Sequence, residues 1–240
     1  MSSWRTCAQT LVTGAAELLF PQFCAFCGLE NPGARICEFC RSLLPGNTQA
    51  CERCAEPLEA RLPDGVHCAS CQQRPPPFRY ARAPFIYSFP VDSALKSLKF
   101  NRDIHYAPVF AEFLLAELQS FPMDIDALLP VPLHRWRHTR RGFNQAIELC
   151  KPLRRASGLP MPGNVHRVRP TRTQSGLSAM ERRRNLRDAF AVSGKLVCRR
   201  PLIVDDVMTT GETCRRLADV LLRHGAQEVG VLAVARSTIR

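Results

Sequence analysis

Two adjacent aspartates, Asp205 and Asp206, are the residues of this 240-residue chain whose type and spacing best suit ligand chemistry. They follow a short apolar run at residues 202–204, which is typical of a strand buried on both faces. Neighbouring carboxylates can hold a diol through hydrogen bonds or a divalent cation through oxygen ligation. Because open parallel sheets bind ligands at the carboxyl ends of their strands, the pair predicts a binding site there.

A turn rich in hydroxyl groups and glycine follows the aspartates and leads into a helix expected over residues 213–224. Hydroxyls and free backbone N–H groups at the positive end of a helix suit a phosphate group. Phosphate, diol and metal together describe a phosphorylated sugar. A purely structural interpretation is also open, in which the aspartates end a strand and a threonine caps the helix. The residues of the turn are Thr209, Thr210, Gly211, Glu212 and Thr213.

Eight of the twelve cysteines form four CxxC pairs, each able to place two thiolates on a tetrahedral zinc ion. The four pairs therefore predict two zinc ions. Proline and glycine interrupt residues 20–73 so often that little core can form, and metal must supply folding energy. Sequential and cross-braced pairing are both possible, and the short intervals favour the sequential one. The pairs are Cys24/Cys27, Cys37/Cys40, Cys51/Cys54 and Cys68/Cys71.

Metal-type cysteine spacing favours a reducing compartment over a disulfide framework. No window reaches eighteen apolar residues, so we expect a cytoplasmic protein without a membrane span. The PPP run at residues 75–77 is a stiff spacer that suggests a boundary. We expect an N-terminal helix at 1–20, a double zinc-ribbon module at 21–74 and an α/β domain at 78–240.

Strands alternating with helices after residue 78 predict an α/β fold with a parallel sheet. Tyr87 and Phe89 are expected in the core, and Cys150, Cys198 and Cys214 are expected to be small buried hydrophobes. A polar segment at 169–178 is typical of a mobile lid. Strands are predicted at 81–88, 125–131, 164–168, 189–192 and 228–235, and helices at 91–100, 104–119, 144–156 and 180–187.

Positive charge is concentrated in one part of the chain. Residues 135–187 contain 14 basic and two acidic side chains, an excess that equals the net charge of +12 of the whole chain. Arg135 and Arg141 lie in the loop after the strand at 125–131, and Gly142 permits close approach of an anion to the backbone. The cluster predicts anion binding, although a charge run can also be a solvated face.

The run PLIVDDVMTTGET at residues 201–213 resembles the phosphoribosyl pyrophosphate (PRPP) signature of type I phosphoribosyltransferases. RGFNQ at 141–145, QSGLSAMERRRNLRDAF at 174–190 and the preceding CxxC pairs occur in the same order in the ComF/GntX family. The chain resembles that family over nearly its whole length. The resemblance implies a zinc-ribbon module joined to a type I phosphoribosyltransferase domain, and a role in natural transformation or the use of external DNA.

The same resemblance assigns roles to the candidate residues. Asp205 and Asp206 would be the catalytic pair that holds the ribose hydroxyls of PRPP, directly or through magnesium. Residues 209–213 would wrap the 5′-phosphate, and Arg135, Arg141 and Gly142 would meet the pyrophosphate. Purine-salvage members carry an acidic base where this chain has Thr209, so purine salvage is not expected.

Three functions are compatible with these features. One is an enzyme that transfers a phosphoribosyl group to an unidentified acceptor. The second is a DNA-uptake factor whose cationic loops and zinc module handle single-stranded DNA in the cytoplasm. The third is a PRPP-responsive adaptor that docks a helicase or DNA-import partner through the zinc module.

Overall fold

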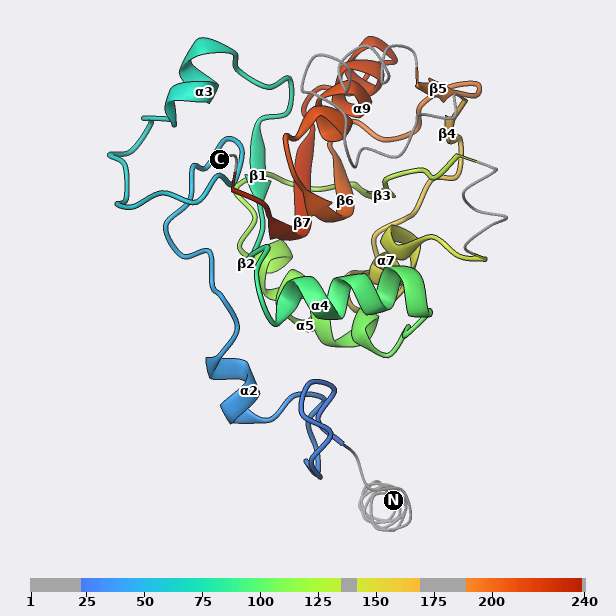
Figure 1. Cartoon of the computed structure of the whole chain (residues 1–240). Helices are drawn as coiled ribbons and strands as arrows, with labels where there is room; N and C mark the ends of the chain where they lie inside the picture. The colour runs from blue at the N-terminus through green and yellow to red at the C-terminus, as the bar shows by residue number, and fades with distance from the viewer. Residues whose placement is uncertain (1–22, 135–141, 169–188, 239–240) are drawn as a thin grey trace, which may run out of the picture. The chain divides into compact units, whose positions relative to one another are not determined.

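The computed structural model describes residues 23–134, 142–168 and 189–238 (Figure 1). The chain divides into two compact units, residues 1–44 and 45–240. This division falls inside the cysteine-rich segment, so the third and fourth CxxC pairs belong to the larger unit. The helices predicted at 1–20 and 180–187 and the predicted lid at 169–178 lie outside the described residues. Within the described ranges, the helices are too short or too polar to cross a membrane.

The described part of the first unit is a cysteine-rich loop followed by one short helix. An isolated bridge joins Phe23 and Glu30 and closes the loop around the first CxxC pair. Helix α2 (Glu38–Ser42) begins after Cys37, whose sulfur accepts a hydrogen bond from the backbone N–H of Cys40. With so little apolar burial, this unit depends on its cysteines for structure.

The second unit is built on a parallel sheet with strand order β1-β7-β6-β3, and β2 also pairs with β7. Strands β6 and β7 are central and almost wholly buried, as their continuous apolar sequences require. Their register places Asp205 opposite Ala233. The strands are β1 (Tyr80–Arg82), β2 (Phe85–Ile86), β3 (Ala127–Pro130), β6 (Pro201–Met208) and β7 (Gly230–Arg236).

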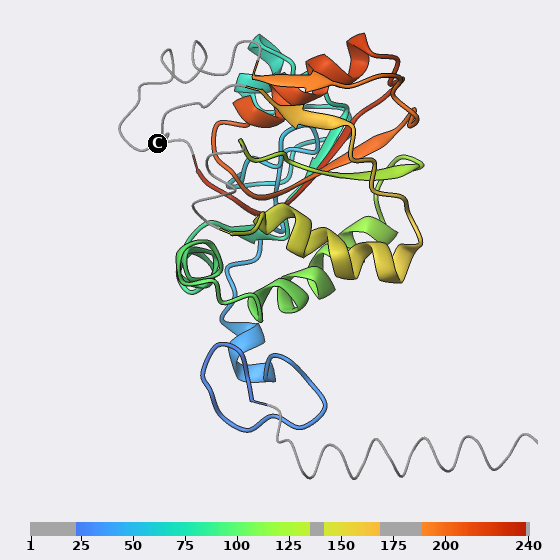
Figure 2. The same cartoon turned by 90° about the vertical axis from the view of Figure 1, so that its right-hand side faces the viewer.

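Helices cover both faces of this sheet, as Figures 1 and 2 show. Helices α5 and α7 pack on one face against β7, β6 and β3, while α9 packs on the other face with the small antiparallel pair β4–β5. A π-helix, η1 (Ser97–Asn101), continues α4 without a break. The remaining elements are α3 (Ala69–Gln73), α4 (Val91–Lys96), α5 (Tyr106–Gln119), α7 (Gln145–Ser157), β4 (Val165–Arg167), β5 (Phe190–Val192) and α9 (Glu212–Arg223).

The predicted fold class, a parallel sheet with flanking helices, is confirmed. Some local predictions are wrong. The strand expected at 81–88 is two short strands, and the helix expected at 91–100 changes to π geometry at Ser97. Strand β6 continues to Met208, so the aspartates lie inside its last half instead of after its end. Phe89 was expected in the core but is 80% exposed.

Three of the four cysteines outside the CxxC pairs, Cys150, Cys198 and Cys214, are buried, as predicted. Burial raises the pKa of all three thiols, that of Cys198 to about 11. A thiol with a raised pKa remains protonated at neutral pH and is a poor nucleophile. Cys150 and Cys214 therefore act as small apolar side chains inside the core.

Candidate functional site

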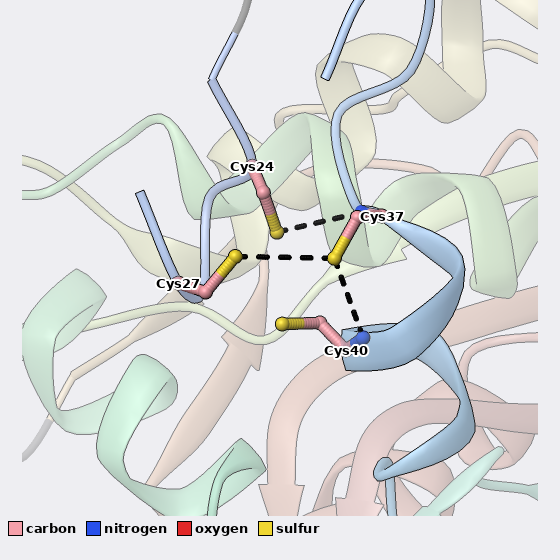
Figure 3. A group of neighbouring side chains, drawn as sticks. All are labelled: Cys24, Cys27, Cys37 and Cys40. Carbon is pink, nitrogen blue, oxygen red and sulfur yellow. Dashed lines mark hydrogen bonds between the residues drawn. The ribbon is translucent and has the colours of Figure 1, made fainter. Parts of the chain in front are cut away.

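The first cysteine cluster converges from two segments of the smaller unit (Figure 3). Its four sulfur atoms lie within 4.8 Å of one another, and those of Cys27 and Cys37 are 3.9 Å apart. Ligands bound to zinc at 2.3 Å in a tetrahedron are about 3.8 Å apart. The backbone N–H of Cys37 also donates to the Cys24 sulfur at 3.4 Å, which favours a thiolate. The residues Cys24, Cys27, Cys37 and Cys40 therefore fit a structural zinc ion.

The second cluster, in the larger unit, repeats this arrangement. Its sulfurs again lie within 4.8 Å, with Cys54 and Cys68 3.6 Å apart, and the Cys68 N–H donates to the Cys51 sulfur at 3.4 Å. Helix α3 begins directly after Cys68, as α2 begins after Cys37. Both clusters join consecutive pairs, which confirms sequential pairing over cross-bracing. The members of the second cluster are Cys51, Cys54, Cys68 and Cys71.

The two aspartates of β6, of which Asp206 is buried and Asp205 partly buried, have pKa values shifted in opposite directions. Burial and then the neighbouring charge of Asp206 raise the pKa of Asp205 well above its usual range. Burial alone would raise the pKa of Asp206 as well, but the Lys99 ammonium outweighs it and lowers that pKa. The Lys99 Nζ lies 2.8 Å from the Asp206 Oδ2. Of the two carboxyls, Asp206 therefore ionises more readily, and Lys99 favours its charged form.

Lys99 reaches this carboxylate from the π-helix η1. Single turns of π-helix are rare and recur at functional sites, because the extra residue changes which side chains face a pocket. Lys96, one turn earlier in α4, instead pairs with Asp92 at 2.6 Å. The change of helix geometry thus separates two nearby lysines, one on a surface carboxylate and one on the candidate ligand-binding pair.

The turn after β6 has the geometry expected of an anion-binding loop. Gly211 caps helix α9 with φ +72°, a left-handed conformation that strains other residues. Glu212 does not place its charge in the turn, because its carboxylate lies 2.8 Å from the Arg216 Nε and 3.9 Å from Arg74. The charge of this buried side chain is thus offset by two arginines. The Glu212 N–H donates to the Thr210 hydroxyl at 3.4 Å, and the other N–H groups and hydroxyls of the turn can serve a phosphate.

Asn144 lies at the end of the sequence segment after β3 that contains Arg135 and Arg141, which we call the basic loop. It caps helix α7 by accepting from the Ala146 N–H at 3.0 Å, and its amide donates to the Val131 carbonyl at 3.0 Å. One buried side chain thus ties the end of β3 to the start of α7. Gly142 has φ +80°, and the Arg102 guanidinium lies 3.4 Å from where a β-carbon would stand. Arg135 and Arg141 lie outside the described residues.

A cavity of about 550 Å³ brings these elements together. Both aspartates, four residues of the turn after β6 (residues 209–213, the phosphate turn) and Asn144 from the base of the basic loop line it. The lining includes Lys96, Lys99, Asn144, Arg167, Asp205, Asp206, Thr209, Gly211, Glu212 and Thr213. A carboxylate pair, an N-terminal helix turn and several cations in one cavity can hold a phosphorylated sugar with its counterion.

Several residues of this cavity were not among the sequence-predicted site residues, and three of them bear on the site: Lys99, Asn144 and Arg167. The sequence contains a weak indication of Lys99, because it is one of only four lysines and comes directly after Leu98, an apolar residue of the predicted helix. Asn144 stands in a helix-capping position of the RGFNQ motif. Arg167 had none, since a buried arginine in a short strand shows no pattern that separates it from a surface residue.

Comparisons with known proteins find two domain families that match different parts of the chain. The double zinc ribbon domain family matches residues 15–72, and the phosphoribosyl transferase domain family matches residues 165–239. The first match contains both cysteine clusters, and the second contains β6, the phosphate turn and α9. The chain is therefore a protein with a double zinc ribbon and a phosphoribosyltransferase domain.

Relatives match along nearly the full chain. DNA utilization protein YhgH of Salmonella typhimurium is 36% identical over 92% of this chain and 99% of its own, and that of Escherichia coli K12 is 36% identical over 84% and 90%. Competence protein F of Haemophilus influenzae is 33% identical over 71% of this chain and 79% of its own. The chain belongs to the ComF/GntX family of these proteins.

Among solved structures, glutamine PRPP amidotransferase from B. subtilis, complexed with ADP and GMP, superposes with a TM-score of 0.34 and 23% identity. The superposition covers 53% of this chain and 26% of that one. The family assignment rests on the sequence relatives and the two domain matches.

Proposed function

We propose that this chain binds PRPP with Mg²⁺ in the cavity at the end of β6 and takes part in the uptake or use of external DNA. The observation that carries the first part is the joint placement of Asp205, Asp206 and the phosphate turn around one cavity. In this proposal the aspartates hold the ribose hydroxyls, and residues 209–213 hold the 5′-phosphate through N–H groups and hydroxyls. Gly142, with Arg135 and Arg141, faces the pyrophosphate.

Magnesium, when bound with PRPP, would neutralise pyrophosphate charge and polarise the bond to the leaving group. The donor set fits such a cation, because two carboxylates lie side by side and can bind it directly or through water. Before the ligand binds, Lys99 favours the ionised form of Asp206, so a carboxylate is available to the incoming ligand. The test is calorimetric titration of PRPP with and without magnesium, and heat independent of magnesium would contradict this arrangement.

Catalysis by the same site is the second candidate function. The intact aspartate pair and phosphate turn favour a transfer of the phosphoribosyl group to a nitrogen acceptor, with pyrophosphate as the leaving group. Thr209 has no basic form at neutral pH, so the acceptor must arrive with its own nucleophilic nitrogen. Pyrophosphate release should be assayed with nucleobases, nucleotides and DNA ends. Absence of turnover with every acceptor would leave PRPP as a bound ligand only.

DNA handling is supported by two facts of different kinds. The relatives are named DNA utilization and competence proteins, and the excess positive charge of the chain is concentrated in residues 135–187. We propose that these cations contact incoming single-stranded DNA in the cytoplasm. Affinity for a labelled oligonucleotide should then fall steeply with salt, because each phosphate contact releases counterions.

Paired substitutions locate such contacts. Arg182→Gln with Arg183→Gln should reduce both the affinity and the salt dependence, since it removes two cations of the basic region. Arg199→Gln with Arg200→Gln, which lies outside residues 135–187, is the matched control with the same change of charge. Equal losses from both pairs would mean a general charge effect with no defined DNA surface.

An adaptor role is the remaining alternative. In that case the zinc module docks a helicase or DNA-import partner, and PRPP controls the docking. Capture of a partner should then require both zinc and PRPP. A partner captured equally well without either one would rule the adaptor role out.

A further inference from the structure

Arg236, the last residue of β7, is buried with 3% of its surface exposed, and its guanidinium makes polar contacts on several sides. On one side it meets the second cysteine cluster. Its Nε donates to the Cys54 carbonyl at 3.1 Å, and its Nη2 forms an ion pair with Glu56. A metal-ligand residue and the acid two positions later are therefore held by one buried cation.

The same guanidinium reaches the start of the phosphate turn. Its Nη1 donates to the Met208 carbonyl at 3.0 Å and also to the Thr209 carbonyl. These carbonyls mark the point where β6 passes into the turn. Because a peptide group is planar, holding its carbonyl also fixes the direction of the N–H of the next residue. Arg236 thus sets the orientation of the peptide groups that begin the phosphate turn.

A second link runs from helix α9 to the chain after the cysteine cluster. The Arg215 guanidinium donates to the Arg74 carbonyl at 2.7 Å and to the Pro75 carbonyl at 3.1 Å. Arg74 in turn lies 3.9 Å from the carboxylate of Glu212 in the phosphate turn. Both ends of the turn are therefore attached to the segment that contains the second cluster.

Because of these hydrogen bonds, a change in the conformation of the second cluster should change the conformation of the phosphate turn. The Cys54 carbonyl follows the backbone of its CxxC knuckle, where Ala55 adopts φ +56° and donates to the Cys51 carbonyl at 2.7 Å. Zinc bonds hold such a knuckle, and the ligand segment of a small metal site loosens without its ion. A displaced Cys54 carbonyl would leave a buried guanidinium short of an acceptor, and the guanidinium would shift with it.

We propose that the second cluster and the sugar-phosphate turn form one coupled unit, in which zinc at this cluster strengthens sugar-phosphate binding through Arg236. The inference rests on the proposed binding of PRPP and adds its control by metal. Arg236 is a positioning residue, because it acts through the turn and is not among the residues that line the cavity. The first cluster belongs to the other compact unit and supplies an internal control.

Coupling between two sites is reciprocal, so the proposal can be tested from the metal side. The full chain loaded with two zinc ions is titrated to equilibrium with a chelator of known affinity, with and without PRPP and magnesium. We expect PRPP to increase the zinc affinity of one site by a factor on the order of 5–150, the usual range of such coupling, and to leave the other unchanged. Equal zinc affinities with and without PRPP would overturn the coupling.

The matched variants are Cys51→Ser and Cys24→Ser, each of which removes the first cysteine of one cluster. Cys51→Ser should weaken PRPP binding by the factor measured from the zinc side, whereas Cys24→Ser should leave it unchanged. Arg236→Lys keeps the charge but cannot reach all of these acceptors. This variant should retain two zinc ions, and the zinc affinity of its second cluster should no longer change when PRPP is added.

The outcomes separate this inference from the proposed function. If the wild-type chain does not bind PRPP, both the proposed function and the coupling are wrong. If it binds PRPP and Cys51→Ser, folded by circular dichroism, binds it as tightly, only the coupling is wrong. Should Cys51→Ser fail to fold, the chelator titration of the wild-type chain alone decides.

Discussion

Replacing Lys99 by methionine removes the cation that pairs with Asp206 while keeping most of the side-chain volume. The Lys99 side chain is 30% exposed and that of Asp206 is 11% exposed, so the pair is neither a surface pair nor a dry one. Exposed ion pairs contribute about 0–1 kcal/mol, and removal of one partner of a buried pair costs about 3–5 kcal/mol. We expect an intermediate loss of about 1–3 kcal/mol in the free energy of unfolding, measured by urea denaturation.

Lys96→Met on the same helix is the matched control. Its ammonium lies 2.6 Å from Asp92, but 55% of the Lys96 side chain is exposed. A pair of this kind at i and i+4 contributes about 0.2–0.5 kcal/mol. The two substitutions should therefore differ clearly although each removes one charge from one helix.

A double-mutant cycle identifies the partner. Asp206→Asn alone and combined with Lys99→Met should give an interaction energy of about 1 kcal/mol or more, as contacting groups do. Additive losses, or equal losses from Lys96→Met and Lys99→Met, would refute the inference that Lys99 holds the charge of Asp206.

Three further predictions concern the turn, the loop and the metal. Gly211→Ala should lose about 1 kcal/mol because of its left-handed φ and should also weaken PRPP binding, whereas Gly158→Ala, with φ +71° at the end of α7, should lose only stability. A Gly211→Ala variant that binds PRPP normally would contradict the geometry of the turn. Asn144→Ala should lower the free energy of unfolding by about 0.5–2 kcal/mol through loss of its helix cap, and an unchanged urea midpoint would contradict this. Mass spectrometry should find two zinc ions per chain and one in each of Cys40→Ser and Cys71→Ser; loss of both ions from either variant would mean that the clusters are not independent.

Much of the fold was predictable because local patterns and tertiary structure agree. The apolar runs of β6 and β7 require burial on both faces, and the CxxC spacing restricts metal binding to a few pairings. The turn from Thr209 to Thr213 carries its own signal, since glycine and hydroxyl residues before a helix have few other uses in this order.

Other features depend on contacts between distant segments and left no local pattern. Lys99 reaches Asp206 from the π-helix η1, and 107 positions separate the two residues in sequence. Arg236 looks like the polar end of an ordinary strand, yet it is buried against the second cysteine cluster. Phe89 shows the reverse case, where an aromatic residue in an apolar context is left exposed before helix α4.

The central claim is that the aspartates of β6 and the following turn form a magnesium-dependent PRPP site. The most direct measurement is calorimetric titration of the zinc-loaded chain with PRPP and magnesium, repeated on the double variant Asp205→Asn, Asp206→Asn. Asp124→Asn, a change at a carboxylate with 85% of its side chain exposed, is the control. The account predicts one binding event per chain that the double variant loses and the control retains. No binding by the wild-type chain, or equal affinity in the folded double variant, would contradict it.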